Sequence, residues 1–303
     1  MEIVRYVGDG GQGDGQVTVG LRDGGTVAPL PFGSLAELLR VPLDALREPL
    51  VPSGPAVDVA GVRLLPPVDG RTEVWAAGVT YERSRSGRVE ESAEASVYEK
   101  VYDAQRPELF LKAVPWRVVT DGEPIAIRAD STLDVPEPEL TVVANRFGEI
   151  VGYTVCNDMS SRSIEGENPL YLPQAKIYNG SCALASGIRP AWEVDPSDLA
   201  ITATVLRGGE VAFEGETSTS RLHRGLTDLV GALFAGLDFP DGALLATGTG
   251  IVPELSFSLE EGDTVEITIA QVGTLSNPVV RGRDAMSWLV GALDRPSARK
   301  VPQ

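Results

Sequence analysis

The stretch VPEPELTVVANRFGEIVGYTVCNDMS, residues 135–160, holds two short runs of residues that favour β-strands. Residues 139–144 and 149–157 are rich in Val, Ile, Thr and Tyr, and Asn and Gly lie between the two runs. This pattern predicts two strands joined by a turn. Acidic side chains stand at the ends of these predicted strands, so the same stretch bears on both the fold and the chemistry.

The rest of the chain continues in a β-rich style with few helices. The strands and helices do not alternate as they do in Rossmann or TIM-barrel folds, so we expect a β-rich α+β fold. Ser34 is a suitable N-cap for the first expected helix. Further strands are expected at residues 117–120, 125–128, 200–206 and 264–269, and helices at residues 35–40, 86–102 and 226–235.

The chain is expected to divide into two unequal parts. A small N-terminal α+β domain is predicted for residues 1–68, with strands at residues 2–7 and 17–21 around a glycine-rich turn. The proline-rich stretch 51–69 is interpreted as a linker along the surface. Residues 69–303 then form the main, catalytic domain.

Composition excludes several classes of protein. The 303 residues are 43% hydrophobic, which is enough to bury a substantial core, and carry a formal net charge of −17. So acidic a surface repels nucleic acids and anionic membranes, and we expect neither as a partner. The two cysteines form no CxxC pair, which argues against a disulfide scaffold or a cysteine-built zinc site. No leader sequence or long apolar run is recognised, so a cytoplasmic location is expected.

Three carboxylates form a candidate metal site. Glu137 and Glu139 are two residues apart, so their side chains project from the same face of an extended strand. Pro136 and Pro138 restrict the backbone to extended conformations, and Asp158 follows the second predicted strand. Such a set suits one hard divalent cation, first Mg²⁺, with Mn²⁺ or Ca²⁺ as possible substitutes. The alternative is a pair of exposed acids on an edge strand.

Several segments occur in an order that is typical of one protein family: ELFLK (108–112), EPEL (137–140), GYTVCNDMS (152–160), Lys176, TGTG (247–250), EGD (261–263) and GTLSNP (273–278). On these segments the chain resembles the fumarylacetoacetate hydrolase family from about residue 75 to residue 280. The resemblance implies a mixed β-sandwich or β-roll, assembled as a homodimer or homotetramer. It also implies that Glu137, Glu139 and Asp158 hold the metal and that Lys176 lies beside it.

One departure from the family pattern narrows the expected reaction. Hydrolytic and decarboxylating members usually carry a histidine that activates water, where this chain has Ser84 in the segment GVTYERS, residues 78–84. A serine hydroxyl cannot take up a proton near neutral pH as imidazole can. The segment resembles instead the branch of the family that contains 2-dehydro-3-deoxy-D-arabinonate dehydratases. The resemblance implies Mg²⁺-dependent loss of water from a 2-keto-3-deoxy sugar acid, giving 2,5-dioxopentanoate when the substrate is a pentonate.

The expected roles of the other site residues follow from this chemistry. Lys176 is the first choice for the base that removes a C3 proton, and a fixed positive charge is its alternative role. Ser84 and Arg88, four residues apart on the predicted helix, are the other catalytic candidates. Substrate contacts are expected from Tyr81, Lys112, Thr247 and Thr249. His223 is interpreted as structural or surface-exposed, since no nucleophile accompanies it in the sequence.

Two other functions remain open at this point. The first is an acylpyruvate or fumarylacetoacetate-type C–C hydrolase, or a dienoate isomerase or decarboxylase, of the same family. It would need another base, with Glu82, Glu90 and Glu91 as candidates. The second is a non-catalytic β-rich binding protein that retains only the metal site.

Overall fold

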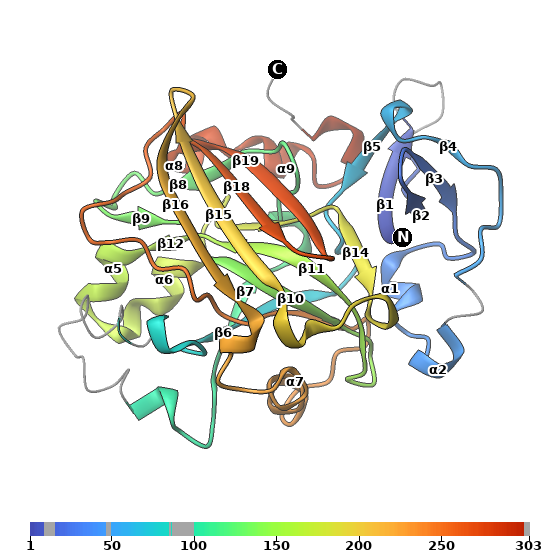
Figure 1. The fold of residues 1–303 in the computed structure, drawn as a ribbon. Helices are drawn as coiled ribbons and strands as arrows, with labels where there is room; N and C mark the ends of the chain where they lie inside the picture. The colour runs from blue at the N-terminus through green and yellow to red at the C-terminus, as the bar shows by residue number, and fades with distance from the viewer. Residues whose placement is uncertain (9–15, 47–49, 85, 87–99, 300–303) are drawn as a thin grey trace.

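Two packed sheets dominate the computed structural model, which describes residues 1–8, 16–46, 50–84, 86 and 100–299 (Figure 1). The larger sheet has 12 strands and the smaller five, and a two-stranded ribbon lies beside them. Helices are short and few among the described residues. The expected β-rich α+β fold is therefore confirmed.

The larger sheet extends from the N-terminal strands to the strands that carry the carboxylates. In spatial order it comprises β4 (Val57–Asp58), β3 (Thr26–Pro29), β2 (Thr18–Asp23), β1 (Glu2–Gly8), β14 (Gly187–Pro190), β11 (Ile150–Asp158), β10 (Pro138–Ala144), β17 (Ala243–Ala246), β6 (Glu73–Gly78) and β7 (Glu108–Ala113). In addition, β5 (Val62–Leu65) pairs with β1 and β13 (Cys182–Leu184) with β11.

The smaller sheet and the helices cover this sheet. The smaller sheet runs β16 (Glu210–Ser218), β15 (Ala200–Arg207), β18 (Thr264–Ile269), β19 (Gly273–Arg281), β8 (Ile125–Ile127), and the ribbon pairs β12 (Ser160–Ser161) with β9 (Asp134–Val135). The helices are α1 (Leu35–Leu38), α2 (Leu43–Leu46), α5 (Arg162–Glu167), α6 (Leu172–Lys176), α7 (Leu226–Phe234), α8 (Gly282–Ala285) and α9 (Trp288–Gly291).

Strand β10 is buried on both faces, which fixes the direction of its acidic side chain. Leu140 and Val142 belong to the core cluster that includes residues of the smaller sheet, such as Ile267. Val143 belongs to a second cluster on the other face, with Leu38 of α1. Side chains alternate along a strand, so Glu139 projects on the same face as Val143. A strand covered on both faces reads as a nearly continuous apolar run, and in residues 140–144 only Thr141 is polar.

The N-terminal strands are hydrogen-bonded into this architecture. β1 pairs with β14 on one side, as well as with β2 and β5. The stretch 51–69 contains β4 and β5, so its interpretation as a linker is wrong. The predicted division between residues 1–68 and 69–303 stays a prediction, although the larger sheet crosses it.

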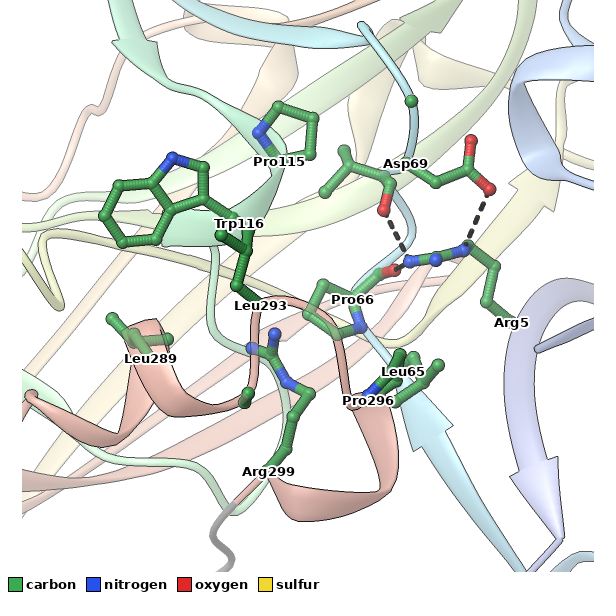
Figure 2. A pocket seen from close by; sticks show the side chains of 13 residues that line it. Arg5, Leu65, Pro66, Asp69, Pro115, Trp116, Leu289, Leu293, Pro296 and Arg299 are labelled. Atoms are coloured by element: carbon green, nitrogen blue, oxygen red, sulfur yellow. Dashed lines mark hydrogen bonds and ion pairs between the residues drawn. The ribbon is translucent and has the colours of Figure 1, made fainter. Parts of the chain in front are cut away.

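Arg5 of β1 ties the N-terminal strands to the following segments (Figure 2). Its guanidinium donates to the backbone oxygens of Pro66 at 2.7 Å and Val68 at 2.5 Å and forms an ion pair with Asp69 at 3.1 Å. These groups line a hollow of about 290 Å³, to which the C-terminal segment contributes Leu289. The hollow therefore lies between the N-terminal strand β1, the segment that follows β5, and the C-terminal segment.

Most of the other predicted elements are confirmed. The strands predicted at residues 125–128, 200–206 and 264–269 correspond to β8, β15 and β18, and the late helix to α7. Ser34 caps α1, since its hydroxyl accepts from the backbone N–H of Glu37 at 3.1 Å. The predicted helix 86–102 lies mostly outside the described residues.

The strand predicted at residues 117–120 is wrong. Residues 117–120 form no strand, because a 3₁₀ turn, Pro115–Arg117, precedes an isolated bridge between Val119 and Ala183. Pro115 holds the first position of that turn, where its missing N–H costs nothing.

Among the helices that the structure describes, none is both long and apolar enough to cross a bilayer.

A buried aspartate in β9 gives the fold a predictable pH dependence. Burial raises the pKa of Asp134 from 3.8 to about 6, and its Oδ1 accepts no hydrogen bond. The folded state therefore holds this proton more tightly than the unfolded chain, so stability is lost as the pH rises from about 4 to 6. Relative to the wild type, Asp134→Asn should gain about 1–1.5 kcal/mol between pH 5 and pH 8 in urea denaturation. A constant difference between the two proteins across this range would contradict the expectation.

Candidate metal centre

The register of β10 and β11 brings the three carboxylates together. Glu139 lies opposite Cys156, and the backbone N–H of Asp158 donates to the carbonyl of Glu137 at 2.9 Å. Directly opposed side chains of an antiparallel pair share a face. Glu137, Glu139 and Asp158 accordingly offer carboxylate oxygens that all lie within 4.8 Å of one another. The cluster predicted from the sequence is thus assembled, and all three residues are buried.

The electrostatics of the cluster fit a hard cation. Burial, and then the charges of Asp158 and Glu137, raise the pKa of Glu139 well above its ordinary value. A divalent cation would reverse this effect, because it stabilises the ionised form. The backbone N–H of Gly248 also donates to Glu139 Oε2 at 2.7 Å. All the candidate metal-ligand atoms are oxygens, which suits Mg²⁺, Mn²⁺ or Ca²⁺. The cavity that the three carboxylates line together with other residues measures about 10 Å³.

Lys176, at the end of α6, lies directly beside the carboxylates as expected. Its Nζ donates to Glu137 Oε2 at 2.6 Å, to Asp158 Oδ2 at 3.1 Å and to Ser160 Oγ at 2.6 Å. The side chain is only 1% exposed and also lines the cavity. Lys176 can therefore act both as a charge beside the carboxylates and as a group that faces a bound molecule.

Two more cations surround the cluster. Lys112 of β7 pairs with Asp158 at 2.5 Å. Arg162 of α5 pairs with Glu137 at 2.5 Å and with Glu165 at 3.5 Å. The sequence analysis missed Arg162; the only signal available was its position four residues after Asp158.

Glu108 is a second functional candidate that the sequence analysis missed. It lines the cavity together with the three carboxylates. Gly78 lies opposite Glu108 in the β6–β7 pair, and a Cβ there would lie 2.0 Å from Glu108 Oε2. A side chain at position 78 would displace the Glu108 carboxylate from this position. Glu108 stands inside the ELFLK segment, but the register that turns it toward the cavity cannot be read from that segment.

Ser84 and Thr249 also line the cavity. The Ser84 hydroxyl donates to the carbonyl of Tyr81 at 2.7 Å, and Thr249 Oγ1 donates to the carbonyl of Ile251 at 3.3 Å. The Tyr81 hydroxyl is buried without a hydrogen-bond partner, and burial, followed by the charge of Glu139, raises the pKa of Tyr81. Among these three, Ser84 and Thr249 are in position to meet a bound molecule directly.

The other predicted residues lie less directly at the site. Thr247 is fully buried, and its hydroxyl donates to the carbonyl of Leu140 at 2.8 Å. Arg88 lies outside the described residues. His223 stacks on Tyr102, with ring centroids 4.2 Å apart, and is not among the residues that line the cavity. The roles assigned to these residues from the sequence stay predictions.

Comparison with known proteins defines the class. The family model described as "Fumarylacetoacetate (FAA) hydrolase C-terminal" matches residues 73–280. The match spans more than half of the chain and includes every ligand of the candidate metal centre. The chain belongs to the fumarylacetoacetate hydrolase family.

Individual members of the family match the chain over most of its length. The chain is 48% identical over 254 residues to a "probable 2-keto-3-deoxyxylonate dehydratase" of Haloferax volcanii, covering 82% of this chain and 87% of the relative. It is 45% identical over 227 residues to the "2-dehydro-3-deoxy-D-arabinonate dehydratase" of Saccharolobus solfataricus, covering 73% and 76%. A solved structure of "2-keto-3-deoxy-D-arabinonate dehydratase complexed with magnesium and 2,5-dioxopentanoate" superposes with a TM-score of 0.80 at 37% identity, over 93% of this chain and 100% of that one.

Removing one carboxylate tests the metal centre without disturbing the fold. In Glu139→Gln the amide keeps the shape but removes a charge that its neighbours repel. We expect Mg²⁺ to bind at least about 100-fold more weakly by calorimetry, with the melting temperature in EDTA unchanged or raised. Wild-type affinity in this variant would refute the assignment of Glu139 as a ligand.

Proposed function

We propose that this protein is a Mg²⁺-dependent dehydratase of a 2-keto-3-deoxy sugar acid, converting a pentonate to 2,5-dioxopentanoate and water. The observation that carries the proposal is Ser84, which lines the carboxylate cavity at the position where hydrolytic members of the family have histidine. The 45–48% identity to dehydratases of such acids supports the same reaction. The enzyme is accordingly a carbon–oxygen hydro-lyase.

The cofactor is Mg²⁺, held by Glu137, Glu139 and Asp158. When bound, it supplies Lewis-acid polarisation of the 2-keto oxygen, which acidifies the C3 protons of the substrate. The three carboxylates would supply only part of the oxygen ligands that such an ion takes, so water and substrate oxygens would complete the set. Lys112, Lys176 and Arg162 balance the negative charge of these ligands, which lets an anionic substrate approach.

The residues around the cavity divide the proton transfers between them. Lys176 takes a C3 proton onto Nζ when it is in its neutral form. In its alternative role, as a fixed positive charge, Lys176 only stabilises the negative charge that develops on the substrate, and another base then takes the C3 proton. The C4 hydroxyl leaves as water with a proton from Glu108, and Ser84 and Arg88 orient it. In the final tautomerisation one proton moves from C5 to C3, and the hydroxyl proton of the resulting C4–C5 enol moves to C4, which converts the C5 alcohol into the aldehyde. Thr249 contacts the substrate beside the metal, whereas Tyr81 does not line this cavity and its substrate contact stays a prediction.

The rival C–C hydrolase needs a base that activates water, and the described structure places none of its candidates Glu82, Glu90 and Glu91 at the carboxylate cavity. Glu82 is exposed and lines a separate hollow with Tyr102 and Arg221. Glu90 and Glu91 lie outside the described residues. A cytoplasmic location, assembly as a homodimer or homotetramer, and a small anionic 2-keto acid as the substrate remain part of the proposal.

The proposed reaction is tested directly with purified protein, Mg²⁺ and a panel of 2-keto-3-deoxy pentonates and hexonates. We expect metal-dependent release of an aldehyde, fastest from a pentonate, and complete loss of turnover in EDTA. Acylpyruvates serve as the control substrates. Cleavage of an acylpyruvate without dehydration of any keto-deoxy acid would refute the proposal in favour of the hydrolase.

Glu108→Gln separates chemistry from metal binding. If Glu108 carries the proton to the leaving hydroxyl, kcat should fall by about 100-fold or more, as for a lost general acid. The stabilisation of the protein by Mg²⁺ should persist, because Glu108 is not a metal ligand. Glu210→Gln, on the exposed edge strand β16, is the matched control and should keep wild-type kcat. Equal kcat values for the two variants would exclude Glu108 from proton transfer.

A further inference from the structure

Lys112 is a fully buried lysine whose contacts all lie within the protein. Its side chain is 0% exposed, and its Nζ donates to the backbone carbonyls of Met159 at 3.0 Å and Lys176 at 2.5 Å. The third neighbour is Asp158 Oδ1 at 2.5 Å, an ion pair without hydrogen-bond alignment. Three oxygens thus surround an ammonium group that has three N–H donors. The substrate contact expected for Lys112 from the sequence does not explain this arrangement.

We propose that Lys112 is a positioning residue, an internal counter-cation that keeps the acidic site assembled before the metal binds. The inference rests on the proposed metal centre and goes beyond it, because it assigns a function to the metal-free state. Lys112 stabilises Asp158 in its ligand position and ties the end of α6 to the end of β11.

The charges of the cluster require such a cation. Glu137, Glu139 and Asp158 are buried within 4.8 Å of one another, and like charges at this distance repel strongly where water is excluded. A buried carboxylate that lacks a partner is costly to the folded state. Lys112 and Lys176 each form an ion pair with Asp158, so the metal-free protein compensates this ligand from two sides.

The two lysines differ in what they face. Lys176 pairs with Asp158 Oδ2 and lines the cavity, so it is available to a bound molecule. Lys112 pairs with Oδ1 and is not among the residues that line the cavity. Lys112 can therefore hold Asp158 from a position outside the cavity, whether or not a metal ion or substrate occupies the cavity.

This division predicts a stability defect that depends on the metal. In Lys112→Met the side chain keeps most of its volume but loses its charge, so Asp158 loses one of its two cations. Mg²⁺ restores a positive charge to the same carboxylates, whereas EDTA does not. A lysine with a merely structural role would affect both states equally.

The experiment compares the melting temperatures of wild type and Lys112→Met in EDTA and in saturating Mg²⁺. We expect the variant to lose about 10 °C in EDTA, as for a broken buried ion pair, and less than half of that in Mg²⁺. Arg299→Met is the matched control, since Arg299 pairs with Glu123 and bonds the carbonyl of Val118 away from the metal centre. It should lose the same amount in both conditions.

Two outcomes distinguish the inference from the function on which it rests. If Mg²⁺ does not stabilise the wild type at all, the metal centre itself is refuted. If Mg²⁺ stabilises the wild type but Lys112→Met loses equal stability with and without it, the role of Lys112 alone is refuted.

A double-mutant cycle in EDTA tests the coupling between Lys112 and Asp158 directly. Where Lys112→Met alone does not fold, the Lys112→Met/Asp158→Asn variant should regain the fold, and its failure to fold would refute the inference. Asp158→Asn removes the charge that Lys112 is proposed to compensate. The cost of Lys112→Met should therefore fall to less than half in the Asp158→Asn background. A double variant that is as unstable as the additive sum would refute the coupling between Lys112 and Asp158.

Discussion

The constraint on which the structure depends is the compensation of three carboxylates in an interior that excludes water. Glu137, Glu139 and Asp158 are ordered by a hairpin that is buried on both faces, so solvent cannot screen them. The compensating cations come from β7 and from α5 and α6, and β7 is distant in sequence from the two helices. The requirement for charge balance therefore fixes the packing of these elements around β10 and β11 as firmly as the apolar core does.

The sequence predicted the fold best where the information is local. β10 and β11 were recognised because β-branched residues and turn residues mark them directly. β5 was missed because the prolines beside it resemble a linker, whereas its pairing with β1 depends on contacts across the sheet. Residues 117–120 were predicted as a strand because Val118 and Val119 are apolar. These residues are buried, but they have no neighbouring strand along their length.

The site divides in the same way. The carboxylates could be predicted, since Glu137 and Glu139 share a face by spacing alone and Asp158 ends the paired strand. Glu108 and Arg162 could not, because their positions depend on the β6–β7 register and on the packing of α5. Lys112 was expected near the site, but the sequence could not show that its ammonium group points at Asp158 and backbone carbonyls rather than at a substrate.

The continuity of the larger sheet has a consequence for how the protein can be divided. β14 lies between β1 and β11, so the N-terminal strands cover an edge of the sheet that carries the metal ligands. A chain trimmed to the region that the family model matches would leave the β1 side of β14 with unpaired N–H and C=O groups. Such edges template intermolecular strand pairing. We therefore expect the N-terminal part to protect this sheet from aggregation, although none of its described residues lines the cavity.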